Sequence, residues 1–377
     1  MTEPTRVFVT QLMLTDFRNH PHLTVAADRR IVVLAGENGA GKTNVLEAVS
    51  MMSPGRGLRR AAHRELSRIG GGGGWAVSGV VEGPWGCVRI GTGLQPGDAA
   101  RNVRIDGEPQ KSADVLTEHL RVMWLTPAMD GLFTGPASDR RRFLDRMVLS
   151  LDPVHGRRVA SFEQALTQRN RILEEIRPDP GWLDAVEAQI AELGVAVAAA
   201  RREAVACLTR LIGDAHDPEA AFPDARIALS GELEDALAGA SAAELEDWYR
   251  TDLAAGRSRD RAAGRTLAGP HRSDLVVHHG PKDMPAALSS TGEQKALLVG
   301  LVLAQARLVT ELARQTPVLL LDEVAAHLDA RRRAALFDIL QNMGVQAYMT
   351  GTDRAAFAAL EDRAFFLDFT PADTGGG

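Results

Sequence analysis

Cysteine is scarce in this chain of 377 residues, in which only Cys87 and Cys207 occur. Two cysteines cannot build a disulfide framework or a thiolate metal cluster, so the sequence favours a reducing, cytoplasmic compartment. Long apolar runs are also missing, because no run approaches the roughly 18 residues that a membrane span needs. Residues 1–6 lead straight into a strand pattern and do not resemble a signal peptide. We therefore expect no membrane partner.

Lysine is the second scarce residue. Among 43 lysines and arginines, the lysines are Lys42, Lys111, Lys282 and Lys295. A lysine at position 42 is chemically informative, since its compact, flexible ammonium differs from the planar arginine fork. The formal net charge of −6 at pH 7 argues against a surface that is basic throughout. It leaves room for a local basic patch that binds nucleic acid.

Apolar residues make up 45% and charged residues 24% of the chain, as in ordinary globular proteins. The order of strand and helix patterns predicts an α/β core in two pieces. The N-terminal piece is expected to contain strands Val7–Leu14, Leu23–Val25 and Ile31–Ala35, helix Asn44–Met52, and antiparallel strands Trp75–Val81, Val88–Gly91 and Val103–Ile105. The C-terminal piece is expected to contain helices Gly292–Ala313 and Ala330–Met343 and strands Val318–Leu321, Val345–Met349 and Ala364–Phe369.

A helical segment separates the two pieces. Its two long helical patterns, Pro153–Ile176 and Trp182–Ile212, are split by the proline-rich turn Arg177–Gly181, which predicts a short antiparallel arm. The expected division is residues 1–135 for the N-terminal part of the core, 136–265 for the helical lobe and 266–370 for the C-terminal part. Residues 371–377 are expected to form a disordered tail.

The segment Gly36–Thr43 fits the pattern G-x-x-x-x-G-K-[ST] without a mismatch. Backbone N–H groups of such a loop surround the β- and γ-phosphates of ATP, and the positive end of the following helix assists them. The nucleotide-binding residues expected here are Gly36, Glu37, Asn38, Gly39, Ala40, Gly41, Lys42 and Thr43. Lys42 would neutralise phosphate charge as a catalytic residue, and the Thr43 hydroxyl would bind Mg²⁺. A glycine-rich turn matching by chance is the alternative, but the motif lies between a buried strand and a helix.

An apolar strand ending in two carboxylates supplies the second half of the site. After Val318–Leu321 come Asp322 and Glu323. Asp322 would hold Mg²⁺ at the strand tip, and Glu323 is positioned to polarise the attacking water as general base. An acidic cap of purely structural importance is the alternative.

A serine and a glycine precede the last long helix. Ser290 and Gly292 lie at a helix N-terminus and predict a second anion-binding surface. An ordinary helix cap, with Glu293 completing a capping box, is the alternative. The order of these residues before Asp322 favours a role in nucleotide binding.

This constellation resembles the ABC-type ATPases. In that family the serine–glycine loop of one subunit closes over the γ-phosphate bound by another, and Ala326–Asp329 looks like the family's D-loop. The split core with an inserted arm resembles the chromosome-maintenance branch. The resemblance implies an ABC-type P-loop ATPase head with an antiparallel β subdomain and an inserted helical lobe.

Three further stretches resemble the bacterial RecF family of DNA replication and repair proteins. They are Leu14–His20, Gly135–Asp145 and Gly269–Leu275. The resemblance covers essentially the whole chain. It implies a slow ATPase that dimerises on ATP and binds DNA at gaps or stalled forks. It also implies action with RecO and RecR to load RecA, within DNA damage repair, recombination and the SOS response.

Two departures from the ABC pattern concern the γ-phosphate. Thr350–Thr352 stands where a histidine is usual, so a hydroxyl would make any contact there and turnover would be slow. Trp124–Asp130 stands where a glutamine or a Pro-Glu-Asp pattern would be expected, and Asp130 is the candidate sensor of metal and water.

Arginine clusters are the candidate DNA contacts, because arginine pairs well with phosphate. One patch contains Arg56, Arg59, Arg60, His63 and Arg64. A second contains Arg140, Arg141 and Arg142 with Arg157 and Arg158. Solvated faces paired with nearby acids, such as Asp139 and Asp145, are the alternative.

Other functions remain open. Another chromosome-maintenance-like ATPase that regulates DNA transactions would share the motifs. A transporter ATPase subunit would have an unbroken core and the histidine. A nuclease would need further metal-binding carboxylates, and a regulator that only binds nucleotide would not need Glu323.

Overall fold

The computed structural model describes residues 3–27, 31–217 and 219–369. These residues form two compact units. The first unit contains the described residues of 1–130, 218–223 and 290–377, and the second contains 131–217 and 224–289. The expected division at 135/136 and 265/266 stays a prediction. The expected tail at 371–377 lies outside the described residues.

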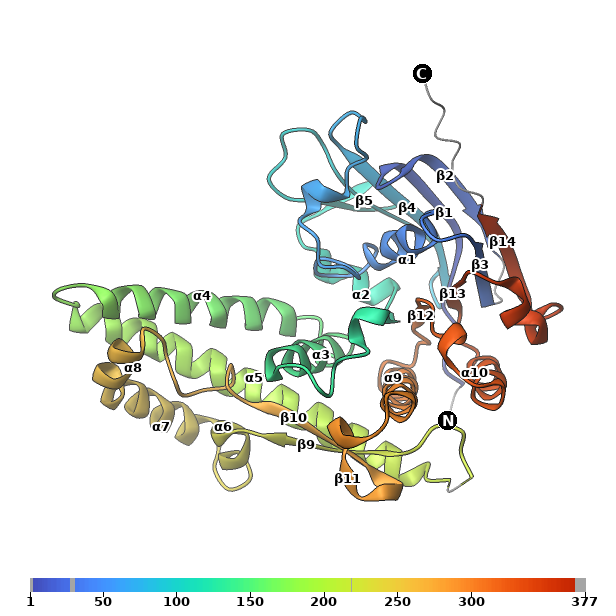
Figure 1. The fold of residues 1–377 in the computed structure, drawn as a ribbon. Coiled ribbons are helices and arrows are strands. Elements are labelled where there is room, and N and C mark those ends of the chain that lie inside the picture. The colour runs from blue at the N-terminus through green and yellow to red at the C-terminus, as the bar shows by residue number, and fades with distance from the viewer. Residues whose placement is uncertain (1–2, 28–30, 218, 370–377) are drawn as a thin grey trace. The chain divides into compact units, whose positions relative to one another are not determined.

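A five-stranded parallel sheet is the centre of the first unit (Figure 1). Its order is β14 (Ala364–Phe369), β3 (Ile31–Gly36), β13 (Ala347–Gly351), β12 (Val318–Leu321) and β8 (Val122–Leu125). Every adjacent pair is parallel. Because the strands are buried on both faces, β12 reads Val-Leu-Leu-Leu without a polar residue. The carboxyl ends of β3, β12 and β13 therefore lie at one edge, where ligands bind in open parallel sheets.

A six-stranded antiparallel sheet forms the rest of the β structure in this unit. Its order is β2 (His20–Ala26), β1 (Phe8–Phe17), β4 (Trp75–Gly83), β5 (Gly86–Leu94), β6 (Asn102–Ile105) and β7 (Glu108–Gln110). Two buried polar side chains connect the two sheets, those of Tyr348 in β13 and of Gln346, the residue before β13. The Gln346 amide donates to the carbonyl of Val9 and accepts from its N–H at 3.1 and 2.7 Å, and the Tyr348 hydroxyl also donates to that carbonyl.

Helices α1 (Lys42–Ser50), α2 (Leu116–His119), α9 (Thr291–Ala313) and α10 (Ala330–Met343) complete the first unit. Among the described residues, α9 is the one helix whose length and composition would allow a membrane span, with a mean hydropathy of 1.7. However, 61% of that window is buried inside the protein, and α9 contacts β8. Core helices share this composition, so α9 is no evidence for a membrane partner.

The second unit is mostly helical. It contains α3 (Ala137–Leu149), α4 (His155–Glu174), α5 (Pro180–Asp214), α6 (Glu232–Ala236), α7 (Ala242–Ala255) and α8 (Arg257–Ala263). Helices α4 and α5 pack side by side as the predicted arm (Figure 1). Strands β9 (Ala225–Ser230), β10 (Asp274–His279) and β11 (Met284–Pro285) form a small antiparallel sheet.

A buried charge network stabilises the arm. Arg169 is fully buried and donates to Glu187 at 2.9 Å and to Asp260 at 2.7 Å. Thr266 and the carbonyl of Leu253 accept its remaining bonds. Each of the three guanidinium nitrogens thus has a partner, as a buried charge requires.

Two stretches that resemble the RecF family pair with each other inside this unit. Arg140 makes a bidentate ion pair with Asp274, both bonds being 2.8 Å. Arg141 donates to the carbonyl of Ser273 at 2.7 Å. Through Asp274, α3 is fixed against β10. These two arginines therefore have a structural use that the sequence did not reveal.

Candidate functional site

The predicted phosphate loop connects the carboxyl end of β3 to the start of α1. Its glycines have positive φ angles of 146° at Gly36, 85° at Gly39 and 98° at Gly41. Such angles are available to glycine at little cost and are strained for other residues. The spacing of the glycines thus matches the backbone conformation that the loop adopts.

Side chains and backbone from elsewhere in the unit contact both ends of this loop. A β-carbon at Gly36 would lie 2.1 Å from the carbonyl oxygen of Phe369. At Gly41 it would lie 2.7 Å from Asn19 and from His20. The His20 ring also lies 3.2 Å from the carbonyl of Gly41 through Nε2. Burial lowers the pKa of His20, while the bond to Gly41 acts in the opposite direction. Asn19 and His20 therefore help to position the loop.

Lys42 is the first residue of α1 and is buried. Its ammonium donates to the carbonyls of Gly36 at 2.5 Å and Glu37 at 2.7 Å. Desolvation lowers the pKa of Lys42, and the carboxylates of Glu323 and Asp322 partly oppose this shift. The single lysine of the loop thus lies over the loop and beside the acidic pair.

The acidic pair after β12 is joined to the loop by hydroxyl groups. Thr43 donates to Asp322 Oδ1 at 2.9 Å, and Thr350 donates to the same oxygen at 2.7 Å. The Thr350 hydroxyl accepts the Glu323 N–H at 2.8 Å. The predicted metal-binding residues Thr43 and Asp322 therefore lie together. Thr350 orients both acidic residues and is itself buried.

Glu323 has a left-handed backbone, with φ at 54°. For a residue with a β-carbon this conformation costs roughly 1 kcal/mol or more and often marks a functional site. The bond from its N–H to Thr350 stabilises the conformation. The side chain is partly exposed, as a general base must be if it is to reach a water molecule.

Ser290 forms the N-cap of α9, and its hydroxyl accepts the N–H of Glu293. The Glu293 carboxylate accepts the N–H of Ser290 at 3.0 Å, which completes the capping box. Gly292 lies in the first turn, and a β-carbon there would meet nothing within 4 Å. Neither residue belongs to the hydrogen-bonded group around Asp322. The glycine leaves the helix N-terminus accessible to a group from outside the chain.

Asp130 accepts a hydrogen bond from Lys295 Nζ at 3.1 Å. It follows β8 and the short turn Pro127–Met129. The carbonyl of Leu125 at the end of β8 accepts the N–H of Asp322. Asp130 is therefore tied to the first turns of α9 through an ion pair, and the strand that precedes it bonds the acidic pair through Leu125. Its role as a sensor of metal and water stays a prediction.

The first arginine patch is partly tied to α1. Arg59 donates to Glu47 at 2.8 Å and to Asn44 at 2.7 Å. Arg18 makes two further bonds to the fully buried Glu47 carboxylate, at 2.8 and 2.7 Å. Arg56 and Arg59 remain exposed. This patch is thus connected to the helix that follows the phosphate loop.

The sequence did not identify the contacts made by Asn19, His20, Thr350 and Phe369. The sequence predicts Thr350 only as a contact to the γ-phosphate, whereas its hydroxyl bonds Asp322 and Glu323. Leu14–His20 stands out in the sequence by its resemblance alone. The turn between the first two strand patterns is the available sequence signal for Asn19 and His20.

The parallel sheet, the phosphate loop and the acidic pair define an ABC-type ATPase head with an inserted helical unit. No family model matches the chain. It is, however, 57% identical to the DNA replication and repair protein RecF of Rhizobium meliloti (strain 1021), with 97% of both chains covered. It is also 55% identical to the RecF protein of Mesorhizobium japonicum, and the match covers 97% of this chain and 96% of the relative. The chain belongs to the RecF family of DNA replication and repair proteins.

Solved structures agree on the fold. The recombination mediator protein RecF with ATPrS in the RecFOR pathway has a TM-score of 0.82 at 21% identity, with 94% of both chains covered. The Smc head domain with an extended coiled coil from Pyrococcus furiosus has a TM-score of 0.52 at 14% identity and covers 97% of this chain and 94% of its own. The predicted fold class is confirmed.

Proposed function

We propose that this chain is a slow, ATP-dependent DNA-binding ATPase of replication and recombinational repair in the cytoplasm. ATP would induce a homodimer that binds DNA at gaps or stalled forks and, with RecO and RecR, promotes loading of RecA. Membership of the RecF family supports this proposal, since the relatives are named DNA replication and repair proteins. A RecF structure described with ATP in the RecFOR pathway supports the nucleotide.

The observation that carries the nucleotide assignment is the hydrogen-bonded group of Thr43, Asp322, Thr350 and Glu323. It places two oxygen atoms that could bind Mg²⁺, Thr43 Oγ1 and Asp322 Oδ1, 2.9 Å apart beside the phosphate loop. Among the described residues no cluster of three or more His, Cys, Asp or Glu could hold a metal by itself. The pair of Thr43 and Asp322 fits Mg²⁺, which binds one or two protein ligands together with phosphates and water.

The loop residues Gly36–Thr43 would bind the phosphates, and Lys42 would neutralise charge that develops during transfer. Glu323 would accept the proton of the attacking water, because its carboxylate follows the strand tip beside Asp322. Bound Mg²⁺ would supply electrostatic stabilisation of the phosphate oxygens. The chain's own residues would orient the water and position both acids.

Ser290 and Gly292 would bind the γ-phosphate of nucleotide held by a second copy. The helix N-terminus offers backbone N–H groups, and the missing side chain at Gly292 allows close approach. Dimerisation would then depend on ATP, since the nucleotide supplies the contact between the copies.

For DNA we propose the patch of Arg56, Arg59 and Arg60. Its connection to Glu47 on α1 would couple the grip on DNA to the phosphate loop. Arg140 and Arg141 are not included, because a DNA phosphate would have to displace Asp274 from Arg140 and the Ser273 carbonyl from Arg141.

ATP turnover and sedimentation, measured together with and without gapped duplex DNA, test the proposal. We expect a monomer without nucleotide and a dimer with ATP. On gapped duplex DNA we expect a dimer that hydrolyses ATP at a different rate from the free protein. A chain that hydrolyses no ATP and stays monomeric with both ligands would contradict it.

A further inference from the structure

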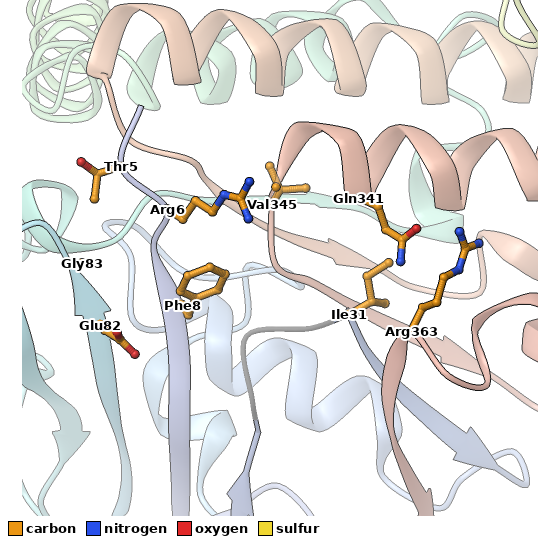
Figure 2. Close-up of a pocket in the computed structure, with 10 residues that line it drawn as sticks. Thr5, Arg6, Phe8, Ile31, Glu82, Gly83, Gln341, Val345 and Arg363 are labelled. Carbon is orange, nitrogen blue, oxygen red and sulfur yellow. The ribbon is translucent and has the colours of Figure 1, made fainter. Parts of the chain in front are cut away.

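A cavity of about 510 Å³ lies in the first unit (Figure 2). Ile31, which begins β3, and Arg363, which directly precedes β14, line it. The cavity therefore lies at the amino edge of the parallel sheet. The phosphate loop follows the carboxyl end of β3, so the nucleotide site and this cavity are at opposite edges. The function proposed above makes no use of it.

Two guanidinium groups line the cavity, those of Arg6 and Arg363. Figure 2 shows Arg6 on one side of Val345, and Gln341 and Arg363 on the other. Arg363 is paired with Asp338 at 3.1 Å. Arg6 is exposed, and within the described part of the chain no ion pair engages it. One of the two cations is thus available to a ligand.

Arg6 lies beside the C-terminus of a helix. Its side chain lies against Gly344, where a β-carbon would come within 2.7 Å of Arg6 Nε. Gly344 has a φ of 63° and ends α10, so the guanidinium lies at the negative end of that helix dipole.

The remaining walls are apolar. Phe8, Ile31 and Val345 line the cavity and are at most 7% exposed. Gly83 lines it as well, and two residues later Trp85 is 75% exposed at the β4–β5 turn. Exposed tryptophans are typical of the residues that dominate protein–protein interfaces.

We propose that this cavity docks an acidic, amphipathic peptide segment of a protein partner. A carboxylate of the segment binds the Arg6 fork, with Arg363 adding charge, and a neighbouring apolar side chain packs on Phe8 and Ile31. The volume suits a few side chains rather than a folded domain.

Fluorescence polarisation with the full chain tests this site. The probe is a labelled heptapeptide of alternating aspartate and leucine, and the matched peptide has asparagine in place of each aspartate. We expect the aspartate peptide to bind at least tenfold more tightly than the asparagine peptide. Arg6→Glu should weaken its binding at least tenfold, and Trp85→Ala should weaken it to a smaller extent. Arg171→Glu, a charge reversal at an exposed site in the second unit, should leave it unchanged.

ATP binding by each variant shows whether the first unit is folded. Arg6→Lys, which retains the charge without the planar fork, should keep part of the affinity. The proposal is overturned if the aspartate peptide binds no more tightly than the asparagine peptide, or if Arg6→Glu binds it like the wild type. It is also overturned if Arg6→Glu loses affinity for single-stranded DNA while its peptide binding is unchanged, since the cavity would then be a phosphate site.

Discussion

Replacing Thr350 by valine isolates one hydroxyl at the centre of the proposed nucleotide site. The two side chains have nearly the same shape, and Thr350 is 1% exposed in β13, so packing should be preserved. The change removes the 2.7 Å bond to Asp322 and the 2.8 Å bond from the Glu323 N–H. It therefore acts on both acidic residues at once without touching the phosphate loop.

The expected magnitude follows from these two bonds. A buried N–H that loses its acceptor costs about 1–3 kcal/mol. That bond stabilises the left-handed backbone of Glu323 at φ 54°, so its loss should let the residue relax to an ordinary conformation. Losing a partner that orients a metal-binding or catalytic group typically reduces activity about 10–100-fold. We expect a fall of that size in kcat, equivalent to roughly 1.4–2.7 kcal/mol of transition-state stabilisation.

Single-turnover ATP hydrolysis and equilibrium ATP binding, measured side by side, check this expectation. ATP affinity should change little, because the backbone and Lys42 of the loop are unaltered. Thr352→Val is the matched control, since Thr352 is exposed two residues further along. Normal hydrolysis by Thr350→Val, together with a loss in Thr352→Val, would refute the reasoning. The exposed hydroxyl would then be the γ-phosphate contact.

Four further substitutions test other parts of the chain. Lys42→Ala should abolish ATP binding in a calorimetric titration, and retained tight binding would contradict the loop assignment. Glu323→Gln should accumulate an ATP-bound dimer, and light scattering that finds only monomer with ATP would argue against a composite site. Ser290→Arg should prevent the ATP-dependent dimer while nucleotide still binds, because Ser290 is proposed to contact nucleotide held by the second copy. Loss of both dimer and nucleotide binding would mean that the loop is structural. Arg169→Met should destabilise the second unit by about 3–5 kcal/mol in urea, since Glu187 and Asp260 lose their buried partner. A urea unfolding midpoint equal to that of the exposed-site control Arg171→Met would contradict this.

Local patterns predicted several elements with their observed bounds. Strands β12 and β14 and helix α10 begin and end at the predicted residues. Helix α4 and helix α5 lie within two residues of their predicted limits. These elements have strong periodicity or unbroken apolar runs with clear ends, so the information is contained in neighbouring residues.

Other elements needed the tertiary structure. Strand β8 was not predicted, because its place in the sheet depends on pairing with β12, which is distant in sequence. Strand β13 was predicted at Val345–Met349 but runs from Ala347 to Gly351. The apolar pattern set that prediction, whereas the observed start follows Gln346, whose side chain bonds the backbone of Val9.

The sequence by itself predicted the phosphate loop and the acidic pair, and the structure brings them together. Glycine spacing in Gly36–Thr43 specifies backbone angles, and an apolar strand ending in Asp322 and Glu323 specifies a sheet edge. Only the tertiary structure decided what supports that chemistry. It placed the Thr350 hydroxyl on both acids and gave Arg140 to Asp274, a partner 134 positions away. Hydrogen bonds between distant residues depend on how strands and helices pack, and no local pattern in the chain encodes that pairing.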